Sequence, residues 1–227
     1  GLDAVFVVPE RFSVEKQQLM RALGAEVINT PTDEGMGRAI ERAHALAEEL
    51  DGGVVPQQFS NPLNAEAHYA TTAPEVYDAL DDEVGAVVAG TGTGGTLMGM
   101  AEYALERDPD TRIVAVQPEG SMYGAFFDDD PEEGAYKTEG IGTHDPTTNE
   151  LFDPDVVDDL LTISDEEVHA EMQRLAAEEG QLVASSAAAN SLAAQQVAEE
   201  IRAGAVDAPH DSVVTIFCDS SERYLSK

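Results

Sequence analysis

The stretch AGTGTGGTLMGM, residues 89–100, places four glycines and three threonines ahead of an apolar helical pattern. The run EVGAVVAG, which ends in this stretch, reads as a buried strand, and LMGMAEYALER reads as a helix. A strand, a glycine-rich loop and a helix in this order present backbone N–H groups and a helix N-terminus to an anion. The stretch therefore predicts a phosphate-binding loop at the carboxyl end of a strand.

Strand and helix patterns alternate along the rest of the chain. The expected strands cover residues 3–9, 26–30, 52–58, 83–90, 111–119, 159–164 and 212–219. The expected helices cover residues 13–25, 37–50, 65–80, 97–107, 164–180 and 186–203, whereas residues 120–154 are Gly-, Asp- and Pro-rich and read as a loop. This alternation predicts an α/β fold of parallel twisted sheets flanked by helices, with ligands at the carboxyl ends of the strands.

Local signals refine four of these helices. Ser13 is expected to cap the first helix, whose apolar stripe is formed by Val14, Leu19 and Leu23. Asn64 is expected to cap the helix that follows it, and Pro74 is expected to break or kink that helix. Ser164 precedes a further helix, and Ser185 is a candidate cap for the alanine-rich one.

The glycine loop admits more than one phosphate chemistry. A Walker loop ends in Gly-Lys-Ser/Thr, but here Gly95 is followed by Thr96 and Leu97, so this interpretation fails. The dinucleotide pattern G-x-G-x-x-G is matched by glycines 90, 92 and 95, and Glu119 ends the next strand, where a ribose-binding acid belongs.

A third interpretation is a cradle for one terminal phosphate. Its residues are Gly92, Thr93, Gly94, Gly95 and Thr96, which offer backbone N–H groups, two hydroxyls and a helix N-terminus. We call residues 92–96 the glycine loop. From these residues alone, the dinucleotide and single-phosphate interpretations both remain open.

The charge of the chain excludes several classes of partner. It has 45 Asp plus Glu against 12 Lys plus Arg and a net charge of −33, which argues against nucleic acid and anionic membranes. Acidic residues spread over all helices with few lysines predict a protein of a salt-in halophile, because molar salt screens such repulsion. The sequence has no membrane-length apolar run and no signal-peptide pattern, so we expect a cytoplasmic protein. One cysteine, Cys218, gives no internal disulfide or cysteine zinc site, and we expect no metal.

Several motifs occur together in a familiar order. They are residues 1–30, QQFSNPLNAEAHYATTAPEVY (57–77), the glycine loop, VQPEGS (116–121), KTEGIG (137–142), LVASSAAA (182–189) and DSSERYLSK (219–227). In this order and spacing the chain resembles the cysteine synthase and cystathionine β-synthase family of pyridoxal-phosphate enzymes over essentially its whole length. The resemblance implies a tryptophan synthase β-like, fold-type II architecture. Residues 1–56 would be the remnant of a smaller mobile domain, and residues 57–227 would be the larger cofactor-binding domain.

The resemblance also implies roles for individual residues. The glycine loop would bind the phosphate of pyridoxal 5′-phosphate, and Ser185 would contact its pyridine nitrogen, although Ser185 is also suited to a helix N-cap. This chain has Ala187 where the family usually has glycine. Gln58 would contact the substrate carboxylate, with a buried structural amide as the alternative.

A second glycine pair would lie over the substrate. By resemblance, Gly140, Ile141 and Gly142 of the EGIG run belong to a loop that closes over the bound substrate. The neighbouring His144 invites an acid–base role, but a surface histidine is the simpler interpretation. His68 is expected to pack or to hydrogen-bond locally.

The reactive lysine of the family has no counterpart in the sequence. That lysine lies in a Ser-x-x-Lys-like run near the family's N-terminus, ahead of an asparagine-bearing TSGNTG loop, and neither run occurs here. Lys16, Lys137 and Lys227 lack this context. We therefore expect an N-terminally incomplete enzyme, from a truncated gene, an interrupted frame or a split enzyme, that has no catalytic residue of its own and is inactive alone.

The family's chemistry implies β-replacement on an amino acid. The first expectation is synthesis of cysteine from O-acetylserine or O-phosphoserine and sulfide, with pyridoxal 5′-phosphate as cofactor, in a homodimeric full-length enzyme. The alternatives are condensation of serine with homocysteine, a catalytically dead or split-enzyme subunit, and an NAD-dependent oxidoreductase.

Overall fold

The computed structural model describes residues 1–127 and 131–224. The chain divides into two compact units. Unit 1 is Gly1–Gln57 together with the segment that begins at Ser221, and unit 2 is Gln58–Ser220. The expected boundary after residue 56 lies one residue before the observed one, and the segment from Ser221 groups with unit 1 rather than with the larger unit.

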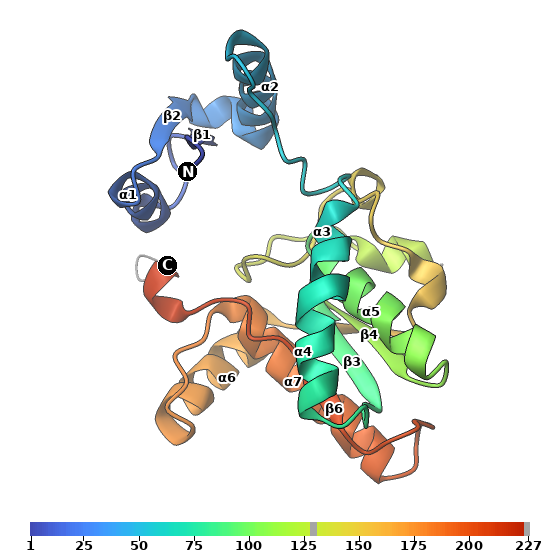
Figure 1. Ribbon diagram of the computed structural model, residues 1–227. Coiled ribbons are helices and arrows are strands. Elements are labelled where there is room, and N and C mark those ends of the chain that lie inside the picture. The colour runs from blue at the N-terminus through green and yellow to red at the C-terminus, as the bar shows by residue number, and fades with distance from the viewer. Residues whose placement is uncertain (128–130, 225–227) are drawn as a thin grey trace. The chain divides into compact units, whose positions relative to one another are not determined.

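Unit 1 is built on a two-stranded parallel sheet (Figure 1). Its elements are β1 (Val5–Pro9), α1 (Val14–Ala22), β2 (Glu26–Thr30) and α2 (Gly35–Glu49). Ser13 caps α1 as expected, because its side chain accepts a hydrogen bond from Lys16 N. The helix α1 provides the crossover that two parallel strands require.

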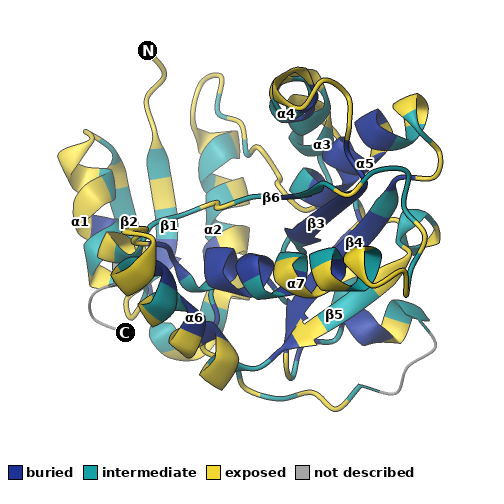
Figure 2. Ribbon diagram, turned by 90° about the horizontal axis from the view of Figure 1, so that it is seen from below, coloured by how far each residue is buried: buried dark blue, intermediate teal, exposed yellow. Residues whose placement is uncertain are grey.

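The face of α1 that is buried differs from the one expected. Val14, Leu19 and Leu23 are all exposed, whereas Gln17 is buried and donates to Phe12 O at 2.9 Å. Figure 2 accordingly shows much of α1 as exposed. The apolar stripe of α1 therefore does not face the two strands of unit 1.

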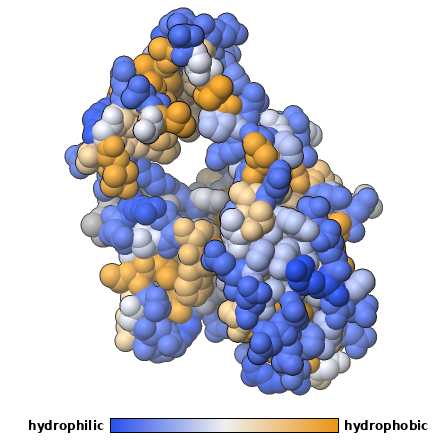
Figure 3. Space-filling model, in the orientation of Figure 1, coloured by the Kyte–Doolittle hydropathy of each residue, from blue (hydrophilic) through white to orange (hydrophobic). Residues whose placement is uncertain are grey.

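Large hydrophobic side chains are exposed mainly in unit 1. Those of unit 1 are Leu2, Phe6, Val14, Leu19, Leu23, Met36, Ile40, Leu50 and Val54. Figure 3 shows hydrophobic residues at the surface of this unit. A two-stranded sheet is marginally stable by itself, so unit 1 has little core of its own.

Unit 2 contains a four-stranded, fully parallel sheet in the order β5-β4-β3-β6. The strands are β3 (Ala86–Gly90), β4 (Arg112–Pro118), β5 (Asp159–Ile163) and β6 (Val213–Thr215). Val87 and Ala89 pack toward α5 (Gly95–Arg107), and Ala86 and Val88 pack toward α7 (Ser185–Arg202). Alternate residues of each strand thus serve two cores, one on each face of the sheet.

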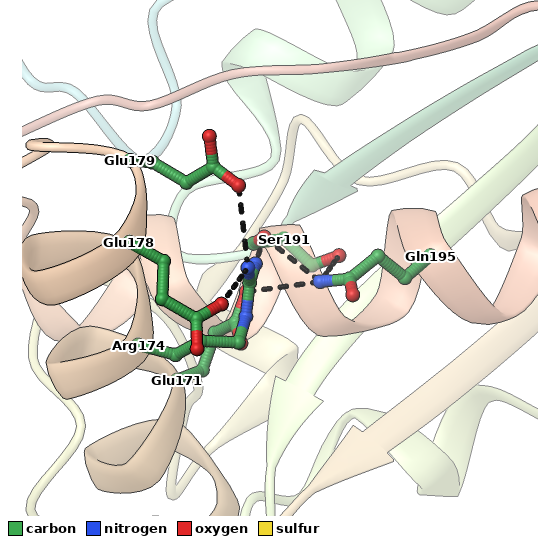
Figure 4. A network of polar contacts seen from close by, with 6 residues as sticks. All are labelled: Glu171, Arg174, Glu178, Glu179, Ser191 and Gln195. Carbon is green, nitrogen blue, oxygen red and sulfur yellow. Dashed lines mark hydrogen bonds and ion pairs between the residues drawn. The ribbon is translucent and has the colours of Figure 1, made fainter.

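The helix α6 (Asp165–Glu178) pairs with α7 on the second face (Figure 1). Ser164 caps α6 in a capping box with Glu167. Figure 4 shows the polar network between the two helices. Glu171 of α6, whose side chain is 4% exposed, accepts hydrogen bonds from Arg174, Ser191 and Gln195.

The segment around Pro74 is continuous rather than broken. It runs from α3 (Leu63–Ala67) through a π-helical turn (His68–Thr72) into α4 (Ala73–Ala79). Pro74 lies in the first turn of α4, where the missing N–H is best tolerated. Asn64 lies inside α3, whose N-cap is Pro62, so the predicted Asn64 cap is wrong.

Two further expectations differ from the structure. Residues 52–58, a predicted strand, lie in no strand. The described residues of the segment 120–154 form two short 3-10 helices, Tyr123–Phe127 and Pro146–Thr148, within irregular backbone, and a third, Pro154–Val156, begins at its end. Across the described residues, no helix combines the length and apolar character that crossing a membrane requires.

Candidate active site

The glycine loop connects β3 to α5 at the carboxyl edge of the sheet. The first intrahelical hydrogen bond of α5 runs from Met98 N to Gly94 O at 2.9 Å. The N–H groups of Gly95, Thr96 and Leu97 therefore precede any i−4 acceptor within the helix. Gly95 N donates to Thr93 Oγ1 at 3.3 Å. The N–H groups of Thr96 and Leu97, with the positive end of the helix dipole, are therefore the groups of α5 that would face an anion.

The three glycines of the loop make room for the protein's own atoms. A Cβ on Gly92 would lie 2.5 Å from Gly140 O, and one on Gly95 would lie 2.2 Å from Asn64 Oδ1. Gly94 has φ +86°, and a Cβ there would lie 3.2 Å from Phe152 Cβ. In the structure these glycines allow neighbouring segments of the chain to pack closely against the loop.

The threonines of the stretch have different environments. Thr91 is fully buried, and its hydroxyl donates to Val116 O at 3.1 Å. Thr93 and Thr96 are partly exposed. The two threonines of the glycine loop are thus partly exposed, whereas the hydroxyl of Thr91, just before the loop, is used inside the sheet.

Two residues of the segment 120–154 hydrogen-bond to the backbone of the glycine loop. Tyr123 Oη and Asn149 Nδ2 both donate to Gly92 O, at 2.9 Å and 2.8 Å. Tyr123 is fully buried, and this burial raises the pKa of its hydroxyl to about 12. The sequence analysis missed both residues. They lie 31 and 57 positions from Gly92, in irregular backbone that leaves no periodic signal in the sequence.

Asn64 and His68 contact the two threonine side chains of the glycine loop. Asn64 Nδ2 donates to Thr93 Oγ1 at 3.0 Å and to Gln58 O at 2.8 Å. His68 Nε2 lies 3.1 Å from Thr96 Oγ1. The expected local contact of His68 is present, since its Nδ1 lies 2.9 Å from Thr72 Oγ1, but its contact with the loop was not foreseen.

The EGIG run lies beside the glycine loop and the start of α7. Gly142 N donates to Thr91 O at 2.7 Å, and Glu139 N donates to Ser185 Oγ at 3.0 Å. Gly140 and Gly142 have φ values of +90° and +87°, where glycine is strongly preferred. The structure thus brings three of the predicted motifs to one edge of the sheet.

Ile141 is placed differently from the substrate-facing role expected of it. Its side chain is 5% exposed and belongs to the core on the α7 face. It lies over Gly90, where an added Cβ would be 2.4 Å from Ile141 Cγ2. The side chain of Ile141 therefore packs inside the protein.

Asp165 anchors the residues ahead of the EGIG run. Its carboxylate accepts hydrogen bonds from Lys137 N, Thr138 N and Thr138 Oγ1. Burial alone would raise the pKa of Asp165, but these hydrogen bonds lower it below its ordinary value. Asp165 therefore stays ionised at neutral pH and ties the loop to the start of α6.

Ser185 is the first residue of α7 and not its N-cap. The N-cap is Ala184, which makes no side-chain capping hydrogen bond, so the N-cap interpretation of Ser185 is wrong. Its hydroxyl is instead partnered by the backbone of Glu139. Ala187 is fully buried in the core, so its methyl group packs inside the protein.

Three other candidate residues do not place their side chains against the glycine loop. Gln58 is exposed and is tied to the loop through its backbone oxygen. His144 stacks on Tyr136 with ring centroids 5.1 Å apart and pairs with Glu133. Glu119, the acid of the dinucleotide interpretation, lines a cavity of about 670 Å³ beyond β4 and β5 whose lining contains none of the loop residues.

The comparisons with known proteins decide between the remaining cofactors. The sequence profile of the family described as "Pyridoxal-phosphate dependent enzyme" matches residues 1–219. This chain belongs to that family. The cofactor is therefore pyridoxal phosphate, and the nicotinamide alternative is set aside.

Individual relatives agree with this assignment. The chain is 44% identical over 227 residues to a cysteine synthase of Helicobacter pylori and 40% identical over 227 residues to an O-acetylserine dependent cystathionine beta-synthase of Bacillus subtilis. It covers 70% of the length of each, and each match covers 100% of this chain.

A solved structure supports the fold. A crystal structure of the O-acetylserine dependent cystathionine beta-synthase from Helicobacter pylori matches with a TM-score of 0.83 and 45% identity. The match covers 100% of this chain and 70% of that one. The fold-type II architecture expected from the sequence is confirmed.

The residues at the carboxyl edge fit pyridoxal phosphate. A phosphate dianion requires several donors, and the start of α5 offers backbone N–H groups and the hydroxyls of the partly exposed Thr93 and Thr96. Ser185 offers a neutral hydroxyl on the neighbouring α7. Among the described residues, no group of three or more His, Cys, Asp or Glu is placed to hold a metal ion.

Proposed function

We propose that this chain carries the cofactor-binding part of a pyridoxal-phosphate enzyme that makes cysteine from O-acetylserine or O-phosphoserine and sulfide by β-replacement. When bound, pyridoxal phosphate supplies an electron sink that lets the β-substituent of an amino acid leave. The observation that carries the proposal is the hydrogen bond from Glu139 N to Ser185 Oγ. It joins the run that would close over the substrate to the serine that would contact the cofactor ring.

Each group of the site has a part in this proposal. The glycine loop binds the cofactor phosphate, and Ser185 holds the pyridine nitrogen. A neutral hydroxyl partner does not enforce protonation of the ring, which tempers the electron sink and suits β-replacement. Gln58 binds the substrate carboxylate, and the backbone of residues 140–142 encloses the substrate.

A second candidate is supported by the named relatives. Two of them are O-acetylserine dependent cystathionine beta-synthases, so homocysteine is the alternative nucleophile to sulfide. A single assay separates the two. The enzyme purified from its native source in molar KCl is given O-acetylserine, and in a parallel reaction O-phosphoserine, each with equimolar sulfide and homocysteine. Excess cysteine supports the first function, excess cystathionine supports the second, and the absence of both products contradicts the proposal.

We further propose that the lysine bound to the cofactor lies on a segment outside these 227 residues, so that this chain alone is inactive. None of Lys16, Lys137 and Lys227 lies in the run that the family resemblance requires. Borohydride reduction of the native enzyme fixes the pyridoxyl group on its lysine, and peptide mass spectrometry locates it. A label on a peptide absent from this sequence is expected, and a label on Lys16, Lys137 or Lys227 would overturn this proposal.

A further inference from the structure

Two side chains of one helical segment each contact one partly exposed threonine of the glycine loop. Asn64 and His68 are four residues apart, and they reach Thr93 Oγ1 at 3.0 Å and Thr96 Oγ1 at 3.1 Å. The segment lies close to α5, because a Cβ on Gly99 would be 2.9 Å from His68 Cβ. The two contacts therefore belong to a tightly packed interface within unit 2.

The hydroxyl of Thr93 is left with only a proton to offer. Its oxygen accepts hydrogen bonds from Asn64 Nδ2 at 3.0 Å and from Gly95 N at 3.3 Å. A hydroxyl has two lone pairs and one donor, so both acceptor positions of Thr93 are occupied. Any ligand that binds this hydroxyl must accept its proton, as a phosphate oxygen does.

The hydroxyl of Thr96 depends on the tautomer of His68. Burial lowers the pKa of His68, so the ring is neutral at pH 7 and one nitrogen donates while the other accepts. If Nε2 carries the proton, Thr96 accepts from it and keeps its own proton free. If Nδ1 carries the proton, Thr96 must donate to Nε2, and its proton is unavailable to a ligand.

The Thr72 hydroxyl lies against the other ring nitrogen, and by donating to that nitrogen it would select the Nε2–H tautomer. Thr72 Oγ1 lies 2.9 Å from His68 Nδ1, and among the described residues it has no other hydrogen-bond partner. A hydroxyl proton finds an acceptor at Nδ1 only when Nδ1 is unprotonated. The π-helical turn begins at His68 and ends at Thr72, so both members of this contact belong to it.

We propose that Asn64 and the pair His68–Thr72 are positioning residues that leave both loop threonines as proton donors to the cofactor phosphate. Asn64 does so by occupying Thr93, and Thr72 does so by holding His68 in the Nε2–H tautomer. This inference rests on the proposed role of the glycine loop as the phosphate site. It also means that the Thr72 hydroxyl, on one side of the His68 ring, determines whether the Thr96 hydroxyl on the other side keeps its proton for a ligand.

The test uses the full chain in molar KCl and a ligand without an aldehyde. The probe is 4′-deoxypyridoxine 5′-phosphate, and 4′-deoxypyridoxine is the phosphate-free comparison, both measured by calorimetry. Thr72→Val removes the hydroxyl at His68, and we expect it to weaken binding of the phosphate probe about three- to tenfold. Thr71→Val is the matched control, because the Thr71 hydroxyl donates to Ala67 O and not to His68. Thr72→Ser keeps the hydroxyl and is expected to bind as the unsubstituted chain does.

A nitrogen-15 NMR spectrum reads the tautomer directly. The chain has 5 histidines, so the His68 signal is assigned by its loss in His68→Gln. The unsubstituted chain is expected to show the Nε2–H pattern. An Nδ1–H pattern, or equal binding by Thr72→Val and Thr71→Val, would overturn the positioning role. If the unsubstituted chain binds both probes equally, the phosphate assignment of the loop fails as well.

Discussion

Glu139 N lies 3.0 Å from Ser185 Oγ, although the two residues are 46 positions apart in the sequence. The bond occupies one acceptor position of the hydroxyl and leaves its proton available. A pyridine nitrogen is an acceptor, so the arrangement suits the role proposed for Ser185. A movement of the EGIG run would therefore lengthen or break this hydrogen bond to the Ser185 hydroxyl.

Removal of this hydroxyl tests that role. Ser185→Ala is expected to weaken binding of 4′-deoxypyridoxine about three- to tenfold, because one hydrogen bond to the ring is lost. Ser186→Ala is the neighbouring control, since Ser186 is buried and lies 4.0 Å from Cys218 Sγ. If Ser186→Ala weakens binding and Ser185→Ala does not, the ring contact belongs to the second serine.

Two glycine-to-alanine substitutions in helices are expected to act in opposite directions. Gly37→Ala in α2 meets no atom within 4 Å, so it should raise the free energy of unfolding by about 0.5–1 kcal/mol. Gly95→Ala would place its Cβ 2.2 Å from Asn64 Oδ1 and displace Asn64 from Thr93. We expect Gly95→Ala to be destabilising in urea denaturation and to weaken binding of the phosphate probe. A stabilising Gly95→Ala would contradict the packing described for the loop.

The α6–α7 network of Figure 4 is expected to contribute to stability through its charged core. Arg174→Met removes both hydrogen bonds of 2.8 Å to the buried Glu171 carboxylate and is expected to lower the free energy of unfolding, because that carboxylate loses its charged donor. Glu178→Gln is the control, since this exposed partner of Arg174 should contribute less than about 1 kcal/mol. Equal effects of the two substitutions in urea denaturation would show that leaving the buried Glu171 carboxylate without its arginine destabilises the fold no more than losing an exposed ion pair.

The same carboxylate predicts a pH dependence. Hydrogen bonds from Arg174 lower the pKa of Glu171 and outweigh the burial that would raise it. Its contribution is therefore complete above the ordinary value of 4.5 and is lost as the pH falls through the lower pKa of the folded state. Urea denaturation between about pH 5 and pH 3 should show a shallower loss of stability in Glu171→Gln than in the unsubstituted chain. Parallel curves would contradict this assignment.

The net charge of −33 predicts a steep dependence on salt. The Debye length falls from about 10 Å at 0.1 M to about 3 Å at 1 M, so KCl should relieve most of the repulsion in this range. A gain of about 3 kcal/mol would raise the Tm by about 6–12 °C. The measurement is a thermal melt over a KCl series, with sucrose as the uncharged control. A Tm that does not change with KCl would contradict the halophilic prediction.

The sequence predicts local structure well where one residue's chemistry decides it. Ser13 caps its helix because a hydroxyl at this position satisfies a free N–H, whatever surrounds it. The order of strands and helices follows from periodicity in the same way. The glycine loop could be found from the strand and the helix that flank it, whereas the EGIG run and Ser185 were found through the family resemblance.

Other features depend on contacts that the sequence does not display. Asn64 reads as a cap, but its side chain is taken by Thr93, which lies 29 positions away. Gln17 is buried in place of the apolar stripe of α1 because Phe12 O and Asn29 provide polar partners. Tyr123 and Asn149 support Gly92 from a segment without periodicity. Each miss is a tertiary hydrogen bond that outweighs a local preference.

The π-helical turn His68–Thr72 also fixes an angle. Upstream of it, Asn64 faces the glycine loop, and downstream of it, Tyr77 is buried in the core of unit 2. Successive residues of an α-helix are about 100° apart around the axis, so the one additional residue of the turn sets the rotational phase between these two side chains. Deletion of a single residue from this turn would leave a regular helix, yet it would rotate Asn64 away from Thr93 while Tyr77 stays in place.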